Sequence, residues 1–255
     1  MGKIICFANQ KGGVGKTSTC VNLCAAIKEK KRKILLVDAD PQGNATTGMG
    51  VDKHIKPSLY EVMIRGVPAE EAIIPTPYGD VIPTNIDLSG AAIELVDAEK
   101  RETVMKRALE PLRNLYDYIF IDCPPSLGLI TLNALVAADS VIIPVQCEYY
   151  AMEGLTDLIT SMRLTKRRFN PQLAIEGILL TMYDRRLSFS SQVAREIKKF
   201  FPKAVFSTVI PRNVRIAEAP SHGMPVGAYS RFSRGADSYD CLAVEFFRHN
   251  HITEV

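Results

Sequence analysis

The feature that most constrains the fold of this 255-residue chain is a glycine-rich loop between a short apolar run and a stretch of helical period. The apolar run IICFA begins at Ile4, the loop reads QKGGVGKT over residues 10–17, and the helical pattern follows at once. A strand, a glycine loop and a helix in this order open a βαβ unit whose helix N-terminus faces the loop. A turn without a binding role would leave the sequence Gly-Lys-Thr unexplained. The loop therefore predicts an α/β fold that binds phosphate where the first helix begins.

Beyond this loop, short runs rich in Ile and Val alternate with longer stretches of helical period, which is typical of βαβ units around a parallel sheet. Strands are predicted at IICFA (from Ile4), ILLVD (Ile34), YIFID (Tyr118), SVIIPV (Ser140), AIEGILLT (Ala174) and STVIP (Ser207). Helices are predicted over residues 16–30, 102–114, 126–137, 151–168, 190–200 and 235–249. We therefore predict a doubly wound α/β fold, a mostly parallel sheet flanked by helices, as a single domain over residues 1–255. Ligands of such a fold lie at the carboxyl ends of the strands.

Composition is that of an ordinary globular chain, with 47% hydrophobic and 23% charged residues. The opening sequence MGKIICFANQ has one lysine and no small-residue cleavage site, so we interpret it as a strand and not a signal peptide. It leaves no room before the loop for a DNA-reading module, and no apolar run is long enough to span a bilayer. Scattered cysteines without a CxxC motif favour reduced core thiols in a cytosolic protein. These are Cys6, Cys20, Cys24, Cys123, Cys147 and Cys241.

The residues of the loop have separate tasks in binding a nucleotide. Gly12, Gly13 and Gly15 can adopt backbone angles closed to other residues, so that main-chain N–H groups converge on phosphate oxygens. Lys16 is expected to bind the β- and γ-phosphates, and the hydroxyl of Thr17 to ligate Mg²⁺. We therefore predict ATP and Mg²⁺ as cofactors. The predicted nucleotide contacts of this segment are Lys11, Gly12, Gly13, Val14, Gly15, Lys16, Thr17 and Ser18.

Aspartates stand at the ends of two predicted strands. The second strand ends at Asp38, and Asp40 stands two residues further on, so the two carboxylates share one side of the strand end. The strand YIFID ends at Asp122, which is suited to hold Mg²⁺ through its waters, as a Walker B aspartate does. Asp38 or Asp40 could instead be an ordinary loop cap. Beside a phosphate-binding loop, however, the three aspartates together predict a metal site.

The net charge of +3 hides an uneven distribution. From Arg163 to Arg215 there are twelve basic residues and three acidic ones, so this segment carries +9 and the rest of the chain −6. A charged segment is often only a solvated face. Such an asymmetry also favours a polyanionic partner, nucleic acid or anionic lipid.

Longer motifs make the chain resemble the ParA and MinD ATPases over nearly its whole length, and the small chromosomal ParA type called Soj most closely. The motifs are KGGVGKT, LLVDADPQGNAT, IDCPPSLG, IPVQCEYYAMEGL and VIPRNVRIAEAPSHG. KGGVGKT resembles the deviant Walker A motif of that family. It departs from the general GxxxxGK[ST] pattern because its first position is Gln10 and because Lys11 stands just before the glycines. The resemblance implies a P-loop NTPase fold and ATP hydrolysis.

The resemblance also implies roles for individual residues. Lys11 would reach the nucleotide of a second subunit, and its charge has no evident task within its own subunit, although it could also be a solvated loop lysine. Asp38 would belong to the Mg²⁺ shell, and Asp40 would orient or activate the attacking water. The loop after the last central strand would frame the adenine through Pro211 and Asn213. The residues assigned to catalysis are Lys11, Lys16 and Asp40.

For partners, the resemblance implies a homodimer that forms on ATP binding and a ParB-like centromere-binding protein that stimulates hydrolysis. It also implies non-specific DNA bound through phosphates, and no membrane. The DNA contacts match Arg186 and Arg215, both inside the +9 segment. The sequence TMYDRRLSFS departs from the family, which often has one arginine in a more polar loop, so Arg185 and Arg186 both stay open as the main contact. A cytoplasmic, nucleoid-associated location is expected from these partners.

Three alternatives stay in view. A MinD-like ATPase that positions the division septum on the membrane needs a basic amphipathic C-terminal helix, whereas this chain ends in VEFFRHNHITEV. An iron–sulfur reductase related to the nitrogenase iron protein needs paired cysteines, and residues 84–97, where a partner for Cys123 is expected, contain none. A nucleotide-dependent regulatory switch for transcription or replication initiation would use the same ATP dimer without cargo.

Overall fold

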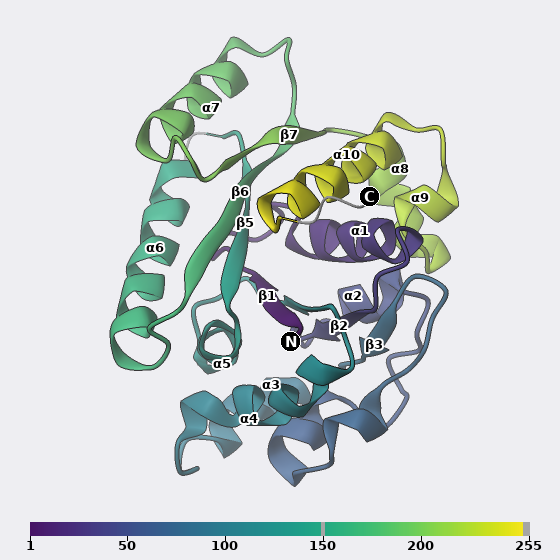
Figure 1. The fold of residues 1–255 in the computed structure, drawn as a ribbon, viewed down its shortest axis with the longest axis vertical. Coiled ribbons are helices and arrows are strands. Elements are labelled where there is room, and N and C mark those ends of the chain that lie inside the picture. The colour runs from purple at the N-terminus through teal and green to yellow at the C-terminus, as the bar shows by residue number, and fades with distance from the viewer. Residues whose placement is uncertain (149–150, 252–255) are drawn as a thin grey trace.

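The computed structural model describes residues 1–148 and 151–251, and within them seven strands form one sheet (Figure 1). The strands are β1 (Lys3–Phe7), β2 (Ile34–Asp38), β3 (Asp80–Ile82), β4 (Tyr118–Asp122), β5 (Ser140–Gln146), β6 (Ala174–Tyr183) and β7 (Val205–Pro211). Their order is β3-β2-β4-β1-β5-β6-β7, and all neighbours in it pair in parallel. The predicted doubly wound α/β fold is confirmed, with later strands added on both sides of β1.

Helices connect the strands. They are α1 (Lys16–Glu29), α2 (Asn44–Gly48), α3 (Leu88–Glu94), α4 (Val104–Leu109), α5 (Leu129–Ala137), α6 (Ala151–Arg168), α7 (Ser188–Phe200), α8 (Val214–Glu218), α9 (Val226–Tyr229) and α10 (Arg234–His249). Shorter helical turns lie at Glu61–Arg65, Ala69–Ala72, Arg101–Thr103, Glu110–Asn114 and Ala219–His222.

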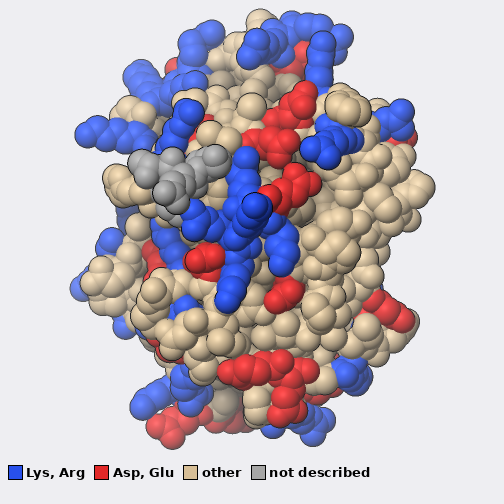
Figure 2. Space-filling view, turned by 45° about the vertical axis from the view of Figure 1, so that its right-hand side comes forward, with Lys and Arg blue, Asp and Glu red and all other residues tan. Residues whose placement is uncertain are grey.

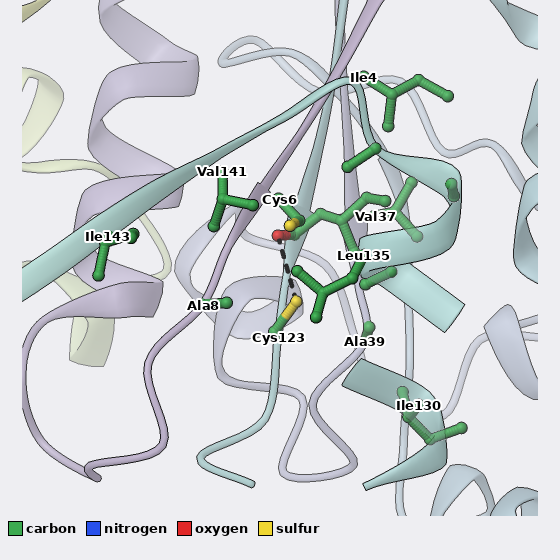
Figure 3. Close-up of a cluster of buried hydrophobic side chains, with 14 of the residues drawn as sticks. Ile4, Cys6, Ala8, Val37, Ala39, Cys123, Ile130, Leu135, Val141 and Ile143 are labelled. Carbon is green, nitrogen blue, oxygen red and sulfur yellow. Dashed lines mark hydrogen bonds between the residues drawn. The ribbon is translucent and has the colours of Figure 1, made fainter. Parts of the chain in front are cut away.

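Alternate residues of each strand face two different helix layers. In β1, Ile4 and Cys6 pack in a core with α4, α5, α6 and α7, whereas Ile5 and Phe7 pack in a core with α1, α2 and α10. Figure 1 shows α1 and α10 together on one side of the sheet and α5 on the other, and Figure 3 shows the core around Cys6 and Leu135. Because helices cover both faces, the central strands are apolar on both sides and read as continuous apolar runs. That is why the sequence reveals them so clearly.

Three parts of the secondary structure differ from the sequence prediction. β3 is a strand that we did not predict, because three residues carry too little of a pattern to detect. The helix predicted over residues 102–114 is broken into the turn Arg101–Thr103, α4 and the turn Glu110–Asn114. Pro111 lacks an N–H group and clashes with the preceding turn, which ends the α-helical bonding before it. The helix predicted from residue 126 begins only at Leu129, after Gly128.

All six cysteines are free, and five are buried as predicted, while Cys241 is exposed. Cys123 follows β4, where its Sγ lies 4.0 Å from the carbonyl oxygen of Ile121 (dashed line in Figure 3). In the described part of the chain, no helix is both long enough and apolar enough to cross a membrane. The last four residues of the C-terminal sequence VEFFRHNHITEV, 252–255, and two residues of the motif IPVQCEYYAMEGL, 149 and 150, lie outside the described residues.

Candidate active site

The carboxyl ends of three neighbouring strands bring the predicted residues together. β4 lies between β1 and β2, and its last residue, Asp122, is in register with Phe7 on one side and Asp38 on the other. The glycine loop follows β1, and Asp40 follows β2, so all of them share one edge of the sheet. This is the edge at which ligands bind in doubly wound folds.

The glycine loop turns back on itself through backbone angles that suit glycine. Gly13 and Gly15 have φ angles of 74° and 87°, a left-handed region that costs glycine little. Gly15 caps α1, and its carbonyl accepts the N–H of Thr19 at 2.9 Å. The carbonyl of Val14 accepts a hydrogen bond of 2.8 Å from the hydroxyl of Thr181, near the end of β6. The loop is therefore fixed at both sides and aims the N-terminus of α1 at the edge of the sheet.

Lys16 is the first residue of α1 and is buried. Its Nζ donates to the carbonyl oxygen of Lys11 at 3.1 Å, so the loop curls around its ammonium group. Burial lowers the pKa of Lys16, and the nearby charges of Asp122 and Asp40 partly oppose that shift. A cation that has lost hydration inside a ring of loop carbonyls and carboxylates is poised for an anionic ligand.

Asp38 is fully buried but well supplied with donors. Its Oδ2 accepts from both the N–H and the hydroxyl of Thr46, each at 2.7 Å, and its Oδ1 accepts from the N–H of Asp40 at 3.2 Å. Burial raises the pKa of Asp38 to about 6, although the Thr46 hydrogen bonds favour the charged form. Thr46 belongs to α2, so this short helix serves to hold the carboxylate in place.

Asp122 is the opposite case. It is fully buried, and neither carboxylate oxygen has a hydrogen-bond partner within the described residues. Burial raises the pKa of Asp122 strongly, and the charge of Asp38 raises it further, while the Thr17 hydroxyl and the charge of Lys16 act in the other direction. Native proteins rarely leave buried polar atoms unpaired, so such a group calls for a specific explanation. A cation beside Asp122 and Asp38 is one.

Asp40 is buried at the start of a tight turn. Its Oδ1 accepts the N–H of Gln42 at 3.0 Å, and its carbonyl accepts the N–H of Gly43 at 2.8 Å. A Cβ at Gly43, where φ is 63°, would lie 2.9 Å from the carbonyl oxygen of Thr84, so the turn needs glycine. Asp40 therefore does act as a loop cap, and its Oδ1 is the carboxylate oxygen engaged in that cap.

Lys11 has a partner in its own subunit, and this corrects our premise that its charge has no task there. Its Nζ forms an ion pair of 2.8 Å with Oε2 of Glu148, which lies two residues after β5. The N–H of Lys11 is also fixed, at 3.0 Å from Oδ1 of the buried Asn9. The symmetric dimer can no longer be argued from an idle charge at Lys11.

Pro211 and Asn213 lie at the end of β7, away from the glycine loop in sequence. Pro211 is the last residue of the strand. Asn213 caps α8, where its Oδ1 accepts the N–H of Arg215 at 2.8 Å. Its side-chain oxygen therefore already has a structural partner, which leaves its amide group and backbone for any contact with an adenine ring.

The basic segment forms an exposed surface above the sheet edge strands. All twelve of its basic residues are exposed. They are Arg163, Lys166, Arg167, Arg168, Arg185, Arg186, Arg195, Lys198, Lys199, Lys203, Arg212 and Arg215. In Figure 2, Lys and Arg side chains gather at the top of the molecule, the height at which Figure 1 places α7. Composition alone had predicted such a surface.

The two arginines assigned to DNA have acidic neighbours. Arg186 pairs with Asp184 at 2.8 Å and lowers the pKa of that carboxyl to about 2, while Arg215 pairs with Glu218 at 2.9 Å. Arg185 and Arg186 line a groove of about 670 Å³ that also includes Arg212 and Arg234. Arg215 follows three residues after Arg212, in the first turn of α8.

Three residues of the site were not predicted from the sequence, namely Asn9, Glu148 and Thr181. Asn9 donates from Nδ2 to the carbonyl oxygen of Pro144 at 2.8 Å and so ties the start of the loop to β5. Their common signal is position, since each stands at or just beyond the carboxyl end of a predicted strand. Reading every polar residue at those ends would have found all three.

Comparisons with known proteins agree with this site. Residues 2–175 match a family described as an AAA domain. The chain is 54% identical to the sporulation initiation inhibitor protein Soj of Bacillus subtilis over 96% of this chain and 98% of that protein. It is 50% identical to the chromosome partitioning protein ParA of Myxococcus xanthus, over 97% and 89% of the two chains.

A solved structure supports the same assignment. It is that of the Mycobacterium smegmatis protein described as cobyrinic acid a,c-diamide synthase, with a bound ATP analog and magnesium. The two chains superpose with a TM-score of 0.87 at 36% identity, over 98% of this chain and 96% of the other. With relatives of this identity and coverage, the chain belongs to the ParA family of partitioning ATPases, which includes Soj.

Proposed function

We propose that this protein is an ATP- and Mg²⁺-dependent partitioning ATPase that binds DNA non-specifically as an ATP-bound dimer and leaves it after hydrolysis. The observation that carries the proposal is Asp122, a buried carboxylate without a hydrogen-bond partner among the described residues, at the mouth of a phosphate-binding loop. The Soj and ParA relatives are more similar than the protein named as an amide synthase, so their role is the one we transfer.

The donor set fits Mg²⁺ together with a nucleotide. Mg²⁺ is usually bound through one or two carboxylates and the phosphates of a substrate, and it keeps several waters. Thr17, Asp38 and Asp122 would hold it, with Thr46 orienting Asp38 from behind. When bound, the ion neutralises charge that develops on the transferred phosphoryl group. Among the described residues, no group of three His, Cys, Asp or Glu forms a metal site without such phosphates.

The chain's own groups then divide the work of hydrolysis. Lys16 and the N–H groups of the glycine loop bind phosphate oxygens and hold them in line. Asp40 orients or deprotonates the attacking water with its carboxylate, which the turn at Gln42 and Gly43 fixes in direction. Pro211 and Asn213 frame the adenine. Lys11 acts across the dimer interface on the partner's nucleotide.

DNA binding follows from the basic surface. Arg186 and Arg215, with Arg185 beside them, contact backbone phosphates, and the dimer doubles the number of such contacts. A ParB-like centromere-binding protein stimulates hydrolysis, which separates the protomers and weakens their hold on DNA. These partners place the protein in the cytoplasm, on the nucleoid.

A double charge reversal tests this proposal. Arg186→Glu with Arg215→Glu should leave ATP binding and dimerisation intact but remove retention on DNA at moderate salt. With the unmodified protein, log K for DNA should fall steeply with log salt, and intermediate single variants should lessen the slope by about one per lost phosphate contact. DNA sequence should hardly matter.

Lys100→Glu with Arg107→Glu is the matched control, since both residues are exposed and belong to or precede α4, far from α7 in Figure 1. That variant carries the same change of net charge. If both double variants lose DNA equally, only net charge is being sensed, and if neither does, the surface has been misplaced.

A further inference from the structure

The ion pair between Lys11 and Glu148 joins two parts of the site that are far apart in sequence. Lys11 stands in the loop after β1, and Glu148 stands just after β5, the strand that pairs with β1. The two side chains are 34% and 49% exposed, so the pair lies at the rim of the site, open to solvent. A residue meant to act on another subunit is thus held, in the monomer, by its own.

Glu148 is built to hold that position. Its N–H donates to the carbonyl oxygen of Gln146 at 2.8 Å, and its own carbonyl accepts the N–H of Ala151 at 3.0 Å, where α6 begins. The amide of Gln146 also donates to Oε1 of Glu148, which leaves Oε2 for Lys11. Both carboxylate oxygens are therefore engaged, and the turn before α6 fixes the backbone.

The Lys11 side of the pair is equally fixed. Its N–H bonds to Asn9, and its carbonyl accepts from Lys16, so only the side chain is free to move. Gly154, in the first turn of α6, comes so close that a Cβ there would lie 3.5 Å from Oδ1 of Asn9 and 4.0 Å from the Cβ of Lys11. One ammonium group cannot serve Glu148 and a second subunit at once.

We propose that Glu148 is a positioning residue that retains Lys11 in the monomer, and that the ATP dimer forms only when Lys11 exchanges this carboxylate for a phosphate on the partner's nucleotide. The inference rests on the proposed sandwich dimer and adds a threshold to it. An exposed ion pair is weak, so the exchange is readily reversible. A triphosphate carries more charge than one carboxylate, and a diphosphate offers less, so the same contact favours dimers with ATP over dimers with ADP.

Glu148→Gln tests the proposal, because it removes the charge and keeps the size of the side chain. Dimerisation of the full chain is measured by sedimentation with Mg²⁺ and a slowly hydrolysed ATP analogue. Each released pair is worth at most about fivefold, and a symmetric dimer releases two, so the association constant should rise roughly 2- to 25-fold. With ADP and Mg²⁺ the variant should stay monomeric. Glu153→Gln, at an exposed acid in the first turn of α6, is the control and should change nothing.

Glu148→Asp separates retention of Lys11 from simple repulsion between acidic groups across the interface. The shorter side chain keeps the charge but reaches Lys11 less well, so it should also strengthen the dimer. An increase with Glu148→Gln alone means repulsion and overturns the proposal, as does an unchanged or weakened dimer in a variant that melts like the parent. If the parent itself forms no dimer with the analogue, the sandwich dimer fails together with the inference.

Discussion

Asp38 and Asp122 stand side by side in the register of two neighbouring parallel strands, and both are completely buried. Only Asp38 is compensated, by hydrogen bonds from Thr46 and Asp40. Two carboxyl groups placed so closely without water disfavour each other's ionised form. The fold thus carries a local electrostatic cost at the point where a cation would remove it, as is common at functional sites.

This cost should be measurable through Asp122→Asn. Burial and the charge of Asp38 raise the pKa of Asp122 in the folded state, so over the range above about pH 4 the unfolded chain binds fewer protons there. Stability from this group therefore falls as pH rises. Without nucleotide or Mg²⁺, the amide variant should melt roughly 2–10 °C higher than the parent at pH 8, for a relief of about 1–3 kcal/mol. The gain should shrink towards pH 4.

The same variant should lose the increase in melting temperature that ATP with Mg²⁺ gives the parent. Asp80→Asn provides a comparison, since Asp80 begins the edge strand β3 away from the loop. A variant that is less stable than the parent at pH 8 would show that Asp122 is satisfied in solution by a group outside the described residues.

Lys16→Ala should weaken ATP binding on the order of a hundredfold or more, because it removes charged hydrogen bonds to two phosphates, each worth about 1.5–3 kcal/mol. Dimerisation and DNA retention should vanish together with it. Calorimetry measures the affinity. Lys28→Ala, in the last turn of the same helix, is the control and should bind ATP as the parent does. Unchanged affinity for Lys16→Ala would refute the loop assignment.

Two substitutions at Asp40 separate catalysis from capping. Asp40→Asn keeps an oxygen that can accept the N–H of Gln42, whereas Asp40→Ala removes the cap as well. Both should bind ATP, hydrolyse it on the order of a hundred- to ten-thousandfold more slowly, and accumulate as dimers on DNA. Only the alanine variant should also lose about 1 kcal/mol of stability. Phosphate release at the parental rate in Asp40→Asn would leave Asp40 as a cap alone.

Thr181→Val tests the support of the glycine loop from β6. The substitution preserves shape but deletes the donor to the Val14 carbonyl, a bond worth about 1 kcal/mol. ATP should bind roughly fivefold more weakly, with little change in the rate at saturation, since the chemistry itself is untouched. Thr156→Val, at an exposed helical threonine whose hydroxyl bonds the Met152 carbonyl, is the control. A slower rate at saturation with unchanged affinity would contradict a supporting role for Thr181.

Much of the fold and the site could be read from the sequence because the informative patterns are local. Gly13 and Gly15 announce positive φ angles through their identity, and Lys16 follows them directly at the start of a helix. The strand ending at Asp122 is apolar on both faces because helices cover both. By contrast, β3 is too short for a pattern, and Pro111 divides a helix whose periodicity looks continuous.

The sequence by itself determined the doubly wound order of elements, the glycine loop and the acids at strand ends, since each depends on neighbours within a few residues. Only the tertiary structure decided which of these groups are paired. Within the described residues it supplied Asp38 with donors from Thr46, left Asp122 without one, and joined Lys11 to Glu148 across 137 positions of chain. Hydrogen bonds and ion pairs need atoms within about 3 Å, and that proximity arises only when distant strands are laid side by side.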